Sequence, residues 1–223
     1  MIEKTLVVGP FQCNCRILVC QTTGDALVVD PGDDASNILT SLKEIKTPSG
    51  LAISVKYLLH THGHLDHIAA TREVKEARSA DAPKTVLHRA DDELYMKLRM
   101  QSQLFQLDYG DPAPIDHYVE DGEELRIGKM RISIIHTPGH SPGSICFRVH
   151  EDLAEETQET LYSGDTLFRE SVGRTDLWGG NQTQMFKSIR NRILILDGDT
   201  RVCPGHGPNT TIAHEIKKNP FLV

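Results

Sequence analysis

The sequence predicts an α+β protein built on mixed β-sheets. Short apolar runs recur between Gly, Pro and Asp turn signals, which is typical of strands. Some of these runs follow one another as hairpins, and others alternate with segments of helical spacing. Hairpins pair strands antiparallel and helical crossovers join parallel strands, so both kinds of pairing are expected.

The elements follow from these patterns in chain order. Strands are expected at residues 4–9, 15–20, 25–30, 55–62, 84–88, 124–128, 130–137, 144–150, 160–165 and 201–205. The second and third of these should form a hairpin through "QTTGD". Helices are expected at residues 35–45, 66–80 and 91–107, the last with Leu94, Leu98 and Leu104 on one side. A Pro-rich loop is expected at 109–124, and a solvated hairpin tip at the acidic segment 150–159.

Composition narrows the function. The 223 residues are 39% apolar and 25% charged, which fits a globular chain with a sizeable core. The net charge is −7, so the chain lacks the excess of basic residues that nucleic-acid binding demands, and we expect no nucleic-acid partner. No apolar run has membrane-spanning length, so we expect no membrane partner either. The chain opens without a secretion-signal pattern and has an odd number of cysteines, five, so we expect reduced thiols and a cytoplasmic location.

Titratable side chains are concentrated at one strand end. The segment "LLHTHGHLDHIAA" holds an H-x-H-x-D-H pattern at residues 62–67, directly after an apolar run. Gly63 lets the backbone bend there, and imidazoles and carboxylates are ligands that Zn²⁺, Fe²⁺ and Mn²⁺ accept. A His-rich polar turn is the alternative. One metal rarely needs four ligands from six residues, whereas two metals could share them.

Three later turns supply side chains of the same kind. His140 lies in "HTPGHSPGS", Asp165 in "LYSGDTLF" and His206 in "VCPGHGPNT". Each alone could be a structural turn residue, but each also comes just past a strand end, where sheets present functional residues. All the elements together predict a centre for two metals, bridged by Asp165 and with open positions for water. The candidate ligands are His62, His64, Asp66, His67, His140, Asp165 and His206.

Two other groups are expected to be structural. Strand alternation should turn His60 away from the ligand cluster. Cys13 and Cys15 could form a metal pair, but their apolar neighbours favour a buried strand.

The patterns "THGHLDH", "HTPGHSPGS", "SGDTLF" and "PGHGP", with "VVDPGDD" before them, resemble the metallo-β-lactamase superfamily over nearly the whole chain. The resemblance implies a four-layer αβ/βα sandwich of two mixed sheets, with a dinuclear site at one edge. It implies one metal on His62, His64 and His140, a second on Asp66, His67 and His206, Asp165 as the bridge, and Asp30 as a supporting residue.

The patterns "GDTLFRESVGRTDLWGG" and "CPGHGPNTTIAHEIKKNPFL" are similar to glyoxalase II and to single-domain hydrolases of that kind. The similarity implies one domain at residues 1–223, without the C-terminal helical domain that supplies part of the glutathione site in the longer enzymes. It implies hydrolysis of a small-molecule thioester such as S-lactoylglutathione by a hydroxide bridging two divalent ions, with zinc expected and iron or manganese as alternatives. Asp66 would also orient the hydroxide. An iron-dependent persulfide dioxygenase and a metal-binding protein without hydrolytic activity are the rival functions, and the oligomeric state is left open.

Two expectations concern the substrate. Arg174 stands where the glyoxalase II pattern has a basic residue that contacts glutathione, so it is expected to bind the substrate; the alternative is a local pair with Asp176. Residues 91–116 are expected to cover part of the active-site mouth, with an ordinary surface helix and loop as the alternative.

Overall fold

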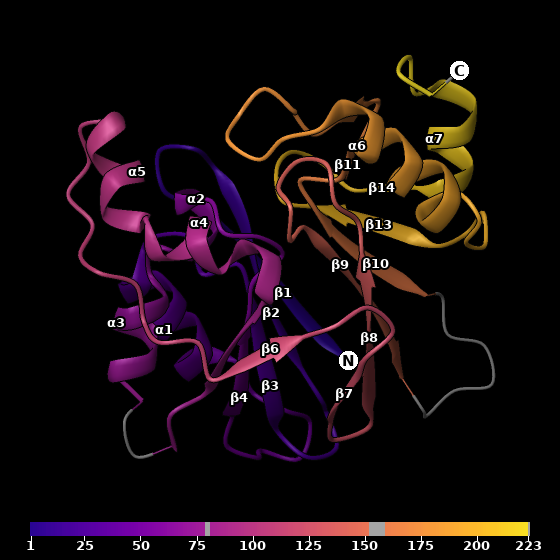
Figure 1. Cartoon of the computed structure of the whole chain (residues 1–223). Helices are drawn as coiled ribbons and strands as arrows, with labels where there is room; N and C mark the ends of the chain where they lie inside the picture. Colours follow the sequence, from indigo (N-terminus) through magenta and orange to yellow (C-terminus); the bar gives the residue numbers. More distant parts are fainter. Residues whose placement is uncertain (79–80, 152–158, 223) are drawn as a thin grey trace.

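The computed structural model describes residues 1–78, 81–151 and 159–222, and it contains two large mixed sheets that pack face to face (Figure 1). The strand orders are β1-β2-β3-β4-β5-β6 and β14-β13-β10-β9-β8-β7, and β11 and β12 form a small third sheet. The predicted α+β class with two mixed sheets is therefore confirmed. The predicted acidic hairpin tip falls mostly on residues 152–158, which lie outside the described residues.

The first sheet begins with hairpins and ends with parallel strands. Its members are β1 (Ile2–Val8), β2 (Cys13–Val19), β3 (Asp25–Val29), β4 (Ser54–Leu59), β5 (Lys84–His88) and β6 (His117–Val119). The pairs β1–β2 and β2–β3 are antiparallel, which confirms the predicted hairpin, and β3 to β6 run parallel.

The second sheet is formed by β7 (Glu124–Ile127), β8 (Met130–His136), β9 (Ile145–Glu151), β10 (Thr160–Gly164), β13 (Arg201–Pro204) and β14 (Thr210–Thr211). The third sheet pairs β11 (Leu167–Phe168) with β12 (Ser171–Val172). Strand β9 is antiparallel to both β8 and β10, and β10 is parallel to β13. Strands β8, β10 and β13 therefore end at the same edge of the sheet.

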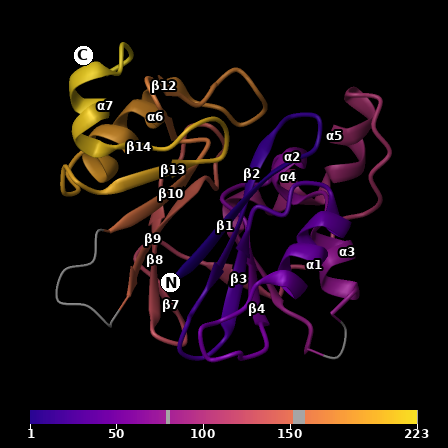
Figure 2. The same cartoon turned by 180° about the vertical axis from the view of Figure 1, so that it is seen from behind.

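Helices cover the outer face of each sheet (Figures 1 and 2). They are α1 (Ala35–Glu44), α2 (Leu65–Ile68), α3 (Thr71–Glu76), α4 (Asp92–Met96), α5 (Leu98–Leu104), α6 (Gln182–Ser188) and α7 (Ile212–Lys218), with a 3₁₀ turn at Arg89–Asp91 and a π-helical turn at Ile189–Ile193. None of the helices within the described ranges is long and apolar enough to cross a membrane.

Strand alternation explains the layers. Leu18 and Leu27 belong to the cluster between the two sheets, where they pack with residues such as Phe147. Their neighbours Ile17 and Val28 belong to a second cluster, with the buried side chains of α1 and α3. Successive side chains of a strand point to opposite faces, so each strand of the first sheet contributes to both cores.

Three predicted elements differ from the structure. The helix expected at 66–80 is two short helices, α2 and α3. The helix expected at 91–107 divides at Lys97 into α4 and α5, and Leu104 is 78% exposed while Leu94 and Leu98 are buried. The expected loop 109–124 contains strand β6, which pairs with the edge of β5. Tertiary packing set these boundaries, since the local patterns alone favoured single helices and a loop.

Candidate metal centre

The structure brings the seven predicted side chains together where strands of both sheets end. His62, His64, Asp66 and His67 follow β4, and His64 is the N-cap of the short helix α2. His140 lies in the turn between β8 and β9, while Asp165 and His206 follow β10 and β13. Backbone torsions change at each strand end, so the side chains can converge on one point.

Three imidazoles form the first group. His64 Nδ1 lies 2.8 Å from His140 Nε2, which in turn lies 3.1 Å from His62 Nε2. All three residues are buried, and their three ligand-capable nitrogens lie within 4.8 Å of one another. This is a facing set of nitrogen donors that a single ion could share.

His67, His206 and Asp66 form the second group. His67 Nε2 lies 3.3 Å from His206 Nε2, and Asp66 Oδ2 lies 3.2 Å from His206 Nε2 and 3.6 Å from His67 Nε2. His206 is the most exposed member, with 26% of its side chain accessible. The second group is therefore more open to solvent than the first.

Asp165 lies between the two groups. One of its oxygens, Oδ1, is 3.4 Å from His67 Nε2, and Oδ2 is 3.7 Å from both His140 Nε2 and His206 Nε2. Gly205 makes room for this carboxylate, because an added Cβ there would come within 2.5 Å of Asp165 Oδ1. A single carboxylate thus reaches nitrogens of both groups.

Contacts outside the centre fix which nitrogens face it. Nδ1 of His62 donates to the Thr61 hydroxyl at 3.0 Å, and Nδ1 of His140 donates to the Arg174 carbonyl at 2.8 Å. Nδ1 of His67 donates to Asp30 Oδ2 at 2.9 Å, and Asp30 also accepts from the backbone N–H and the hydroxyl of Thr61. Such contacts orient the rings and leave the Nε2 lone pairs directed at the centre.

These residues fit metal ions. The Nε2 atoms of His62 and His140 face each other at 3.1 Å although the Nδ1 hydrogens are already used, so two lone pairs oppose each other. Asp165 Oδ1 is buried and has no hydrogen-bond partner among the described residues. A cation shared by these atoms would relieve both conflicts, and nitrogen with carboxylate oxygen is a donor set of zinc, iron and manganese sites.

Burial and charge favour the ligand forms of His62, His64 and Asp165, whereas nearby carboxylates such as Asp165 and Asp66 raise the pKa of His67 and His206, which must lose a proton to bind metal. Burial lowers the pKa of His62 well below its ordinary value and that of His64 to about 3, so both imidazoles are neutral near pH 7. Burial alone would raise the pKa of Asp165, but the imidazoles of His67, His140 and His206 lower it overall. Neutral imidazole and ionised carboxylate are the forms that bind metal.

Asp91 joins the two loops of the first group and was missed from the sequence. Its Oδ2 accepts from the Gly63 N–H at 2.8 Å and from the Ser141 hydroxyl at 2.6 Å, and its Oδ1 accepts from the Gly143 N–H at 2.6 Å. The side chain is fully buried. Asp91 therefore holds the turn that carries His62 and the turn that carries His140 in one arrangement.

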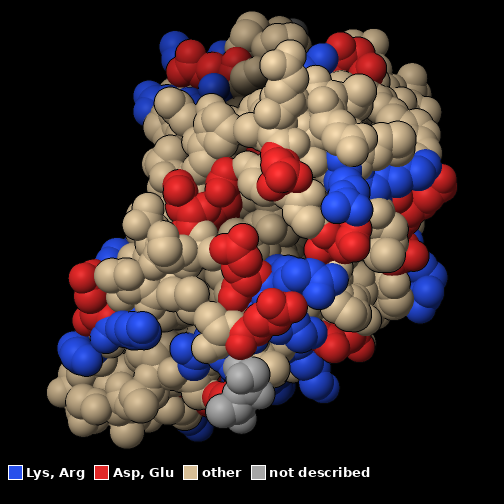
Figure 3. All heavy atoms as spheres, turned by 90° about the vertical axis from the view of Figure 1, so that its left-hand side faces the viewer, with Lys and Arg blue, Asp and Glu red and all other residues tan. Residues whose placement is uncertain are grey.

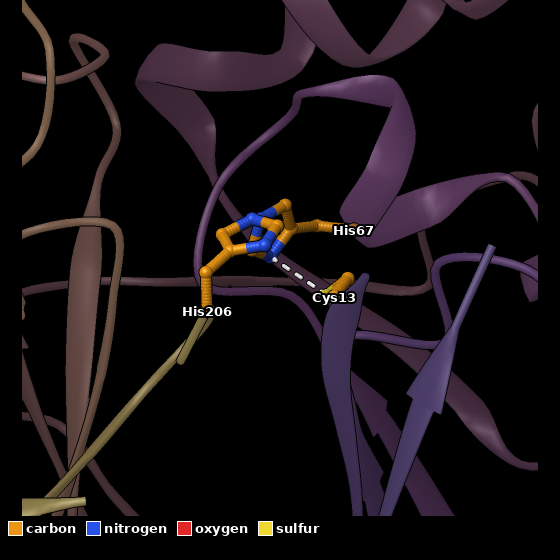
Figure 4. Close-up of side chains that lie close together, drawn as sticks. All are labelled: Cys13, His67 and His206. Atoms are coloured by element: carbon orange, nitrogen blue, oxygen red, sulfur yellow. Dashed lines mark hydrogen bonds between the residues drawn. The ribbon is translucent and has the colours of Figure 1, made fainter. Parts of the chain in front are cut away.

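Cys13 lies close to the centre, beside the outer edge of His67 (Figure 4). Its Sγ is 3.7 Å from His67 Nδ1, the nitrogen that already donates to Asp30. Cys13, His67 and His206 each have a ligand-capable atom within 4.8 Å of the other two. Burial raises the pKa of the Cys13 thiol to about 12, so the group is a neutral thiol near pH 7. The buried-strand interpretation of Cys13 agrees with its place in β2.

His60 has no nitrogen left for a metal. Its Nδ1 donates to the Val86 carbonyl at 2.9 Å, and its Nε2 lies 2.8 Å from the Thr71 hydroxyl. The side chain of His60 thus points away from the ligand cluster, as the strand alternation predicted.

The side chain of Arg174 forms the local pair that was the alternative. Its Nε and guanidinium nitrogen donate to the two carboxylate oxygens of Asp176 at 2.7 and 2.8 Å, and 61% of the side chain is exposed. The residue still lines the pocket beside the centre, and its carbonyl orients His140. Backbone and side chain of Arg174 therefore face different partners.

Only part of the segment 91–116 lines the pocket. The residues of this segment in the pocket wall are Leu94, Lys97, Met100, Gln101, Leu104 and Phe105. The Pro-rich part packs elsewhere, because Arg72 donates to the Asp111 and Pro112 carbonyls. The helical half of the segment therefore borders the mouth, and the loop anchors it.

Comparison with known proteins identifies the family. Residues 8–206 match the family model described as the metallo-beta-lactamase superfamily. The chain belongs to the metallo-β-lactamase superfamily. Members of this superfamily are metal-dependent hydrolases with two divalent ions.

Three similar proteins place the chain within the superfamily. A Haemophilus influenzae protein named hydroxyacylglutathione hydrolase GloC is 34% identical, covering 98% of this chain and 97% of that one. The structure of the BLEG-1 B3 metallo-beta-lactamase is 36% identical with a TM-score of 0.83, covering all of both chains. The structure of TTHA1623 in a di-iron-bound form is 32% identical with a TM-score of 0.81, covering 98% of this chain and 100% of that one.

Proposed function

We propose that this protein is a metal-dependent hydrolase that cleaves a thioester such as S-lactoylglutathione. The observation that carries the proposal is the position of Asp165 between two groups of imidazoles, within 3.4–3.7 Å of His67, His140 and His206. The similarity to a protein named hydroxyacylglutathione hydrolase supports a thioester as substrate.

The two groups of side chains would each hold one divalent ion. His62, His64 and His140 would hold the first, Asp66, His67 and His206 the second, and Asp165 both. When bound, the two ions supply a water of lowered pKa and positive charge for the carbonyl oxygen. We propose zinc, with iron or manganese as alternatives, since this donor set suits all three and one similar structure holds two irons.

Asp66 is proposed as the catalytic residue of the chain. It lines the pocket beside the centre and contacts His206 Nε2 through Oδ2. Burial opposes the charged form, but His67 and His206 lower the pKa of Asp66 overall, so the carboxylate is ionised near pH 7. An ionised carboxylate in this place can accept a hydrogen bond from the attacking water and orient it.

Hydrolysis needs no separate general acid on this chain. Water adds its oxygen to the carbonyl carbon, the C–S bond breaks, and sulfur leaves with the bonding electrons. The products are a carboxylic acid and a thiol. A thiol of pKa near 8.5 is a good leaving group, so the departing sulfur does not require protonation in the same step.

Elemental analysis together with a hydrolysis assay tests the proposal. We expect two ions per chain and a rate of S-lactoylglutathione hydrolysis that rises with metal content. One iron per chain with oxygen uptake on a persulfide would instead indicate a dioxygenase. Bound metal with no turnover of either substrate would indicate a metal-binding protein of this fold.

β-Lactam hydrolysis is a second candidate, because a structure titled B3 metallo-beta-lactamase is 36% identical over the full length. The same two-ion chemistry would apply, but the leaving group is an amide nitrogen, which departs less readily than a thiolate. A chromogenic cephalosporin assayed beside the thioester separates the two. A cephalosporin rate above the thioester rate would replace our first proposal.

A cytoplasmic location remains part of the proposal. All five cysteines are buried and free. Such thiols fit a reducing compartment.

A further inference from the structure

A pocket of about 310 Å³ opens beside the metal centre. His64, Asp66, His140 and Asp165 line its inner end. The remaining wall comes from Leu65, from α4 and the segment 97–105, from the loop 174–178 and from Phe11, which packs beside Phe105. A substrate bound at the centre can therefore extend into this pocket.

The wall is made mainly of large apolar side chains that are exposed. Met100, Leu104, Phe105 and Trp178 are each 50–78% exposed, and the Phe105 ring packs edge-on against Phe11 at 5.0 Å. Exposed large apolar side chains are unremarkable singly, but several around one pocket mark a binding surface. The wall leads directly to the catalytic centre.

The polar side chains in this wall are already paired. Lys97 binds Glu93 at 2.7 Å and lies 3.4 Å from the centre of the Trp178 ring. Gln101 donates to the Gly63 and Leu94 carbonyls and accepts from the Leu65 N–H.

Arg174, the remaining cation of the wall, forms the bidentate pair with Asp176. On the face shown in Figure 3, Lys and Arg are interspersed with Asp and Glu and do not gather into one basic patch. Lys97 and Arg174 are thus already paired with carboxylates and do not offer a free positive charge to a multiply charged group. A hydrocarbon group, by contrast, can pack on the exposed apolar side chains.

We propose that the group entering this pocket is uncharged and apolar, so that the substrates are thioesters with an alkyl or aromatic group next to the scissile bond. This inference rests on the proposed thioester hydrolysis and narrows its substrate class, so that thioesters with a longer apolar group are preferred over S-lactoylglutathione. Burying one methylene is worth about 0.8 kcal/mol, which converts to a roughly fourfold gain in kcat/KM for each methylene that the pocket covers.

Two substrate series test the proposal on the metal-loaded protein. One series lengthens the acyl group of N-acetylcysteamine thioesters from acetyl to octanoyl, and the other lengthens the thiol of acetyl thioesters from ethanethiol to hexanethiol. We expect kcat/KM to rise roughly fourfold per methylene in one series, which also shows which side of the bond enters the pocket. A flat or falling trend in both, with acetyl thioesters still hydrolysed, overturns the proposal and leaves the hydrolase function intact.

Binding gives a readout that needs no turnover. Trp178 is the single tryptophan of the chain and lines the pocket, so its fluorescence reports occupancy. Thioethers of the same chain lengths, which cannot be hydrolysed, should bind with a Kd that falls roughly fourfold per methylene. A falling Kd with no hydrolysis of any thioester supports the apolar pocket and refutes thioester hydrolysis; a Kd independent of length refutes the pocket.

A matched pair of variants locates the effect. Leu104 is 78% exposed and lines the pocket, whereas Ile195 is 72% exposed and does not line it. In the series that responds to chain length, Leu104→Ser should reduce the gain from two added methylenes by about threefold, and Ile195→Ser should leave it unchanged. Equal effects of both variants would show that the preference does not come from this wall.

Discussion

The metal centre and the pocket wall beside it are built in opposite ways. Most side chains of the centre are buried, and their ring nitrogens are held by further contacts such as those of Asp30 and Arg174. The wall consists mainly of exposed apolar side chains on short helices and loops. The difference teaches that the proposed chemistry would depend on strand ends fixed by the core, whereas the proposed selectivity would depend on elements that can change without disturbing the sheets.

The largest effect should come from Asp165→Ala. Removing the carboxylate that reaches both groups should lower the content of both metals and reduce kcat/KM by more than about 100-fold, because residues that merely support ligands already cost 10–100-fold. Elemental analysis and the hydrolysis assay check this. The exposed Asp111→Ala serves as the control, and two retained metals with a full rate would reduce Asp165 to a turn residue.

Asp91→Ala should come next, because it damages the centre without removing a ligand. The change leaves the N–H groups of Gly63 and Gly143 buried without their acceptor, at about 1–3 kcal/mol each. We expect a lower unfolding midpoint and a 10–100-fold weaker metal affinity, measured by chelator competition.

Asp91→Asn keeps one acceptor oxygen, so its metal affinity should lie between those of the wild type and Asp91→Ala. Equal metal affinities in all three proteins would show that Asp91 does not position the two turns that carry His62 and His140.

Gln101→Ala tests how far the wall depends on the centre. The amide joins α5 to the backbone of Gly63 and Leu65, so its loss should loosen the wall and raise KM by about tenfold while both metals remain. A fall in metal content would show that the two regions are not independent. The exposed neighbour Gln103→Ala should leave both quantities unchanged.

The smallest effect should come from the exposed ion pair of Arg174 and Asp176 beside the pocket. If Arg174 contacts a charged substrate, Arg174→Ala should raise KM for glutathione thioesters about two- to fivefold with metal content unchanged, since exposed ion pairs are worth 0.2–1 kcal/mol. Asp176→Ala frees the guanidinium and should lower the same KM. A KM that does not respond to either variant would remove the Arg174 side chain from substrate binding.

The sequence predicted the sheets better than the helices. Strand segments such as 84–88 coincide with β5, because their alternation and turn signals are local. The segment 91–107 showed one helical period, yet it divides at Lys97. Strand β6 was hidden in a Pro-rich segment because its pairing with β5 is a long-range contact.

The seven candidate ligands were visible because each carries metal-binding chemistry in a turn after an apolar strand. Asp91 and Gln101 were not, because nothing in their surroundings in the sequence shows that they bond to turns 28 to 52 residues away. The apolar character of the wall was also hidden, since Phe11, Leu104 and Trp178 come from distant segments.

The sequence by itself determined the alternation that layers the sheets and the donor atoms available at the strand ends. Only the tertiary structure decided which ring nitrogens face the centre, that Arg174 is paired with Asp176, and that the pocket wall is apolar. The physical reason is that residue type and local periodicity are properties of short segments. The direction of a side chain beyond a strand end depends instead on backbone torsions and on the contacts that the packed sheets and helices impose.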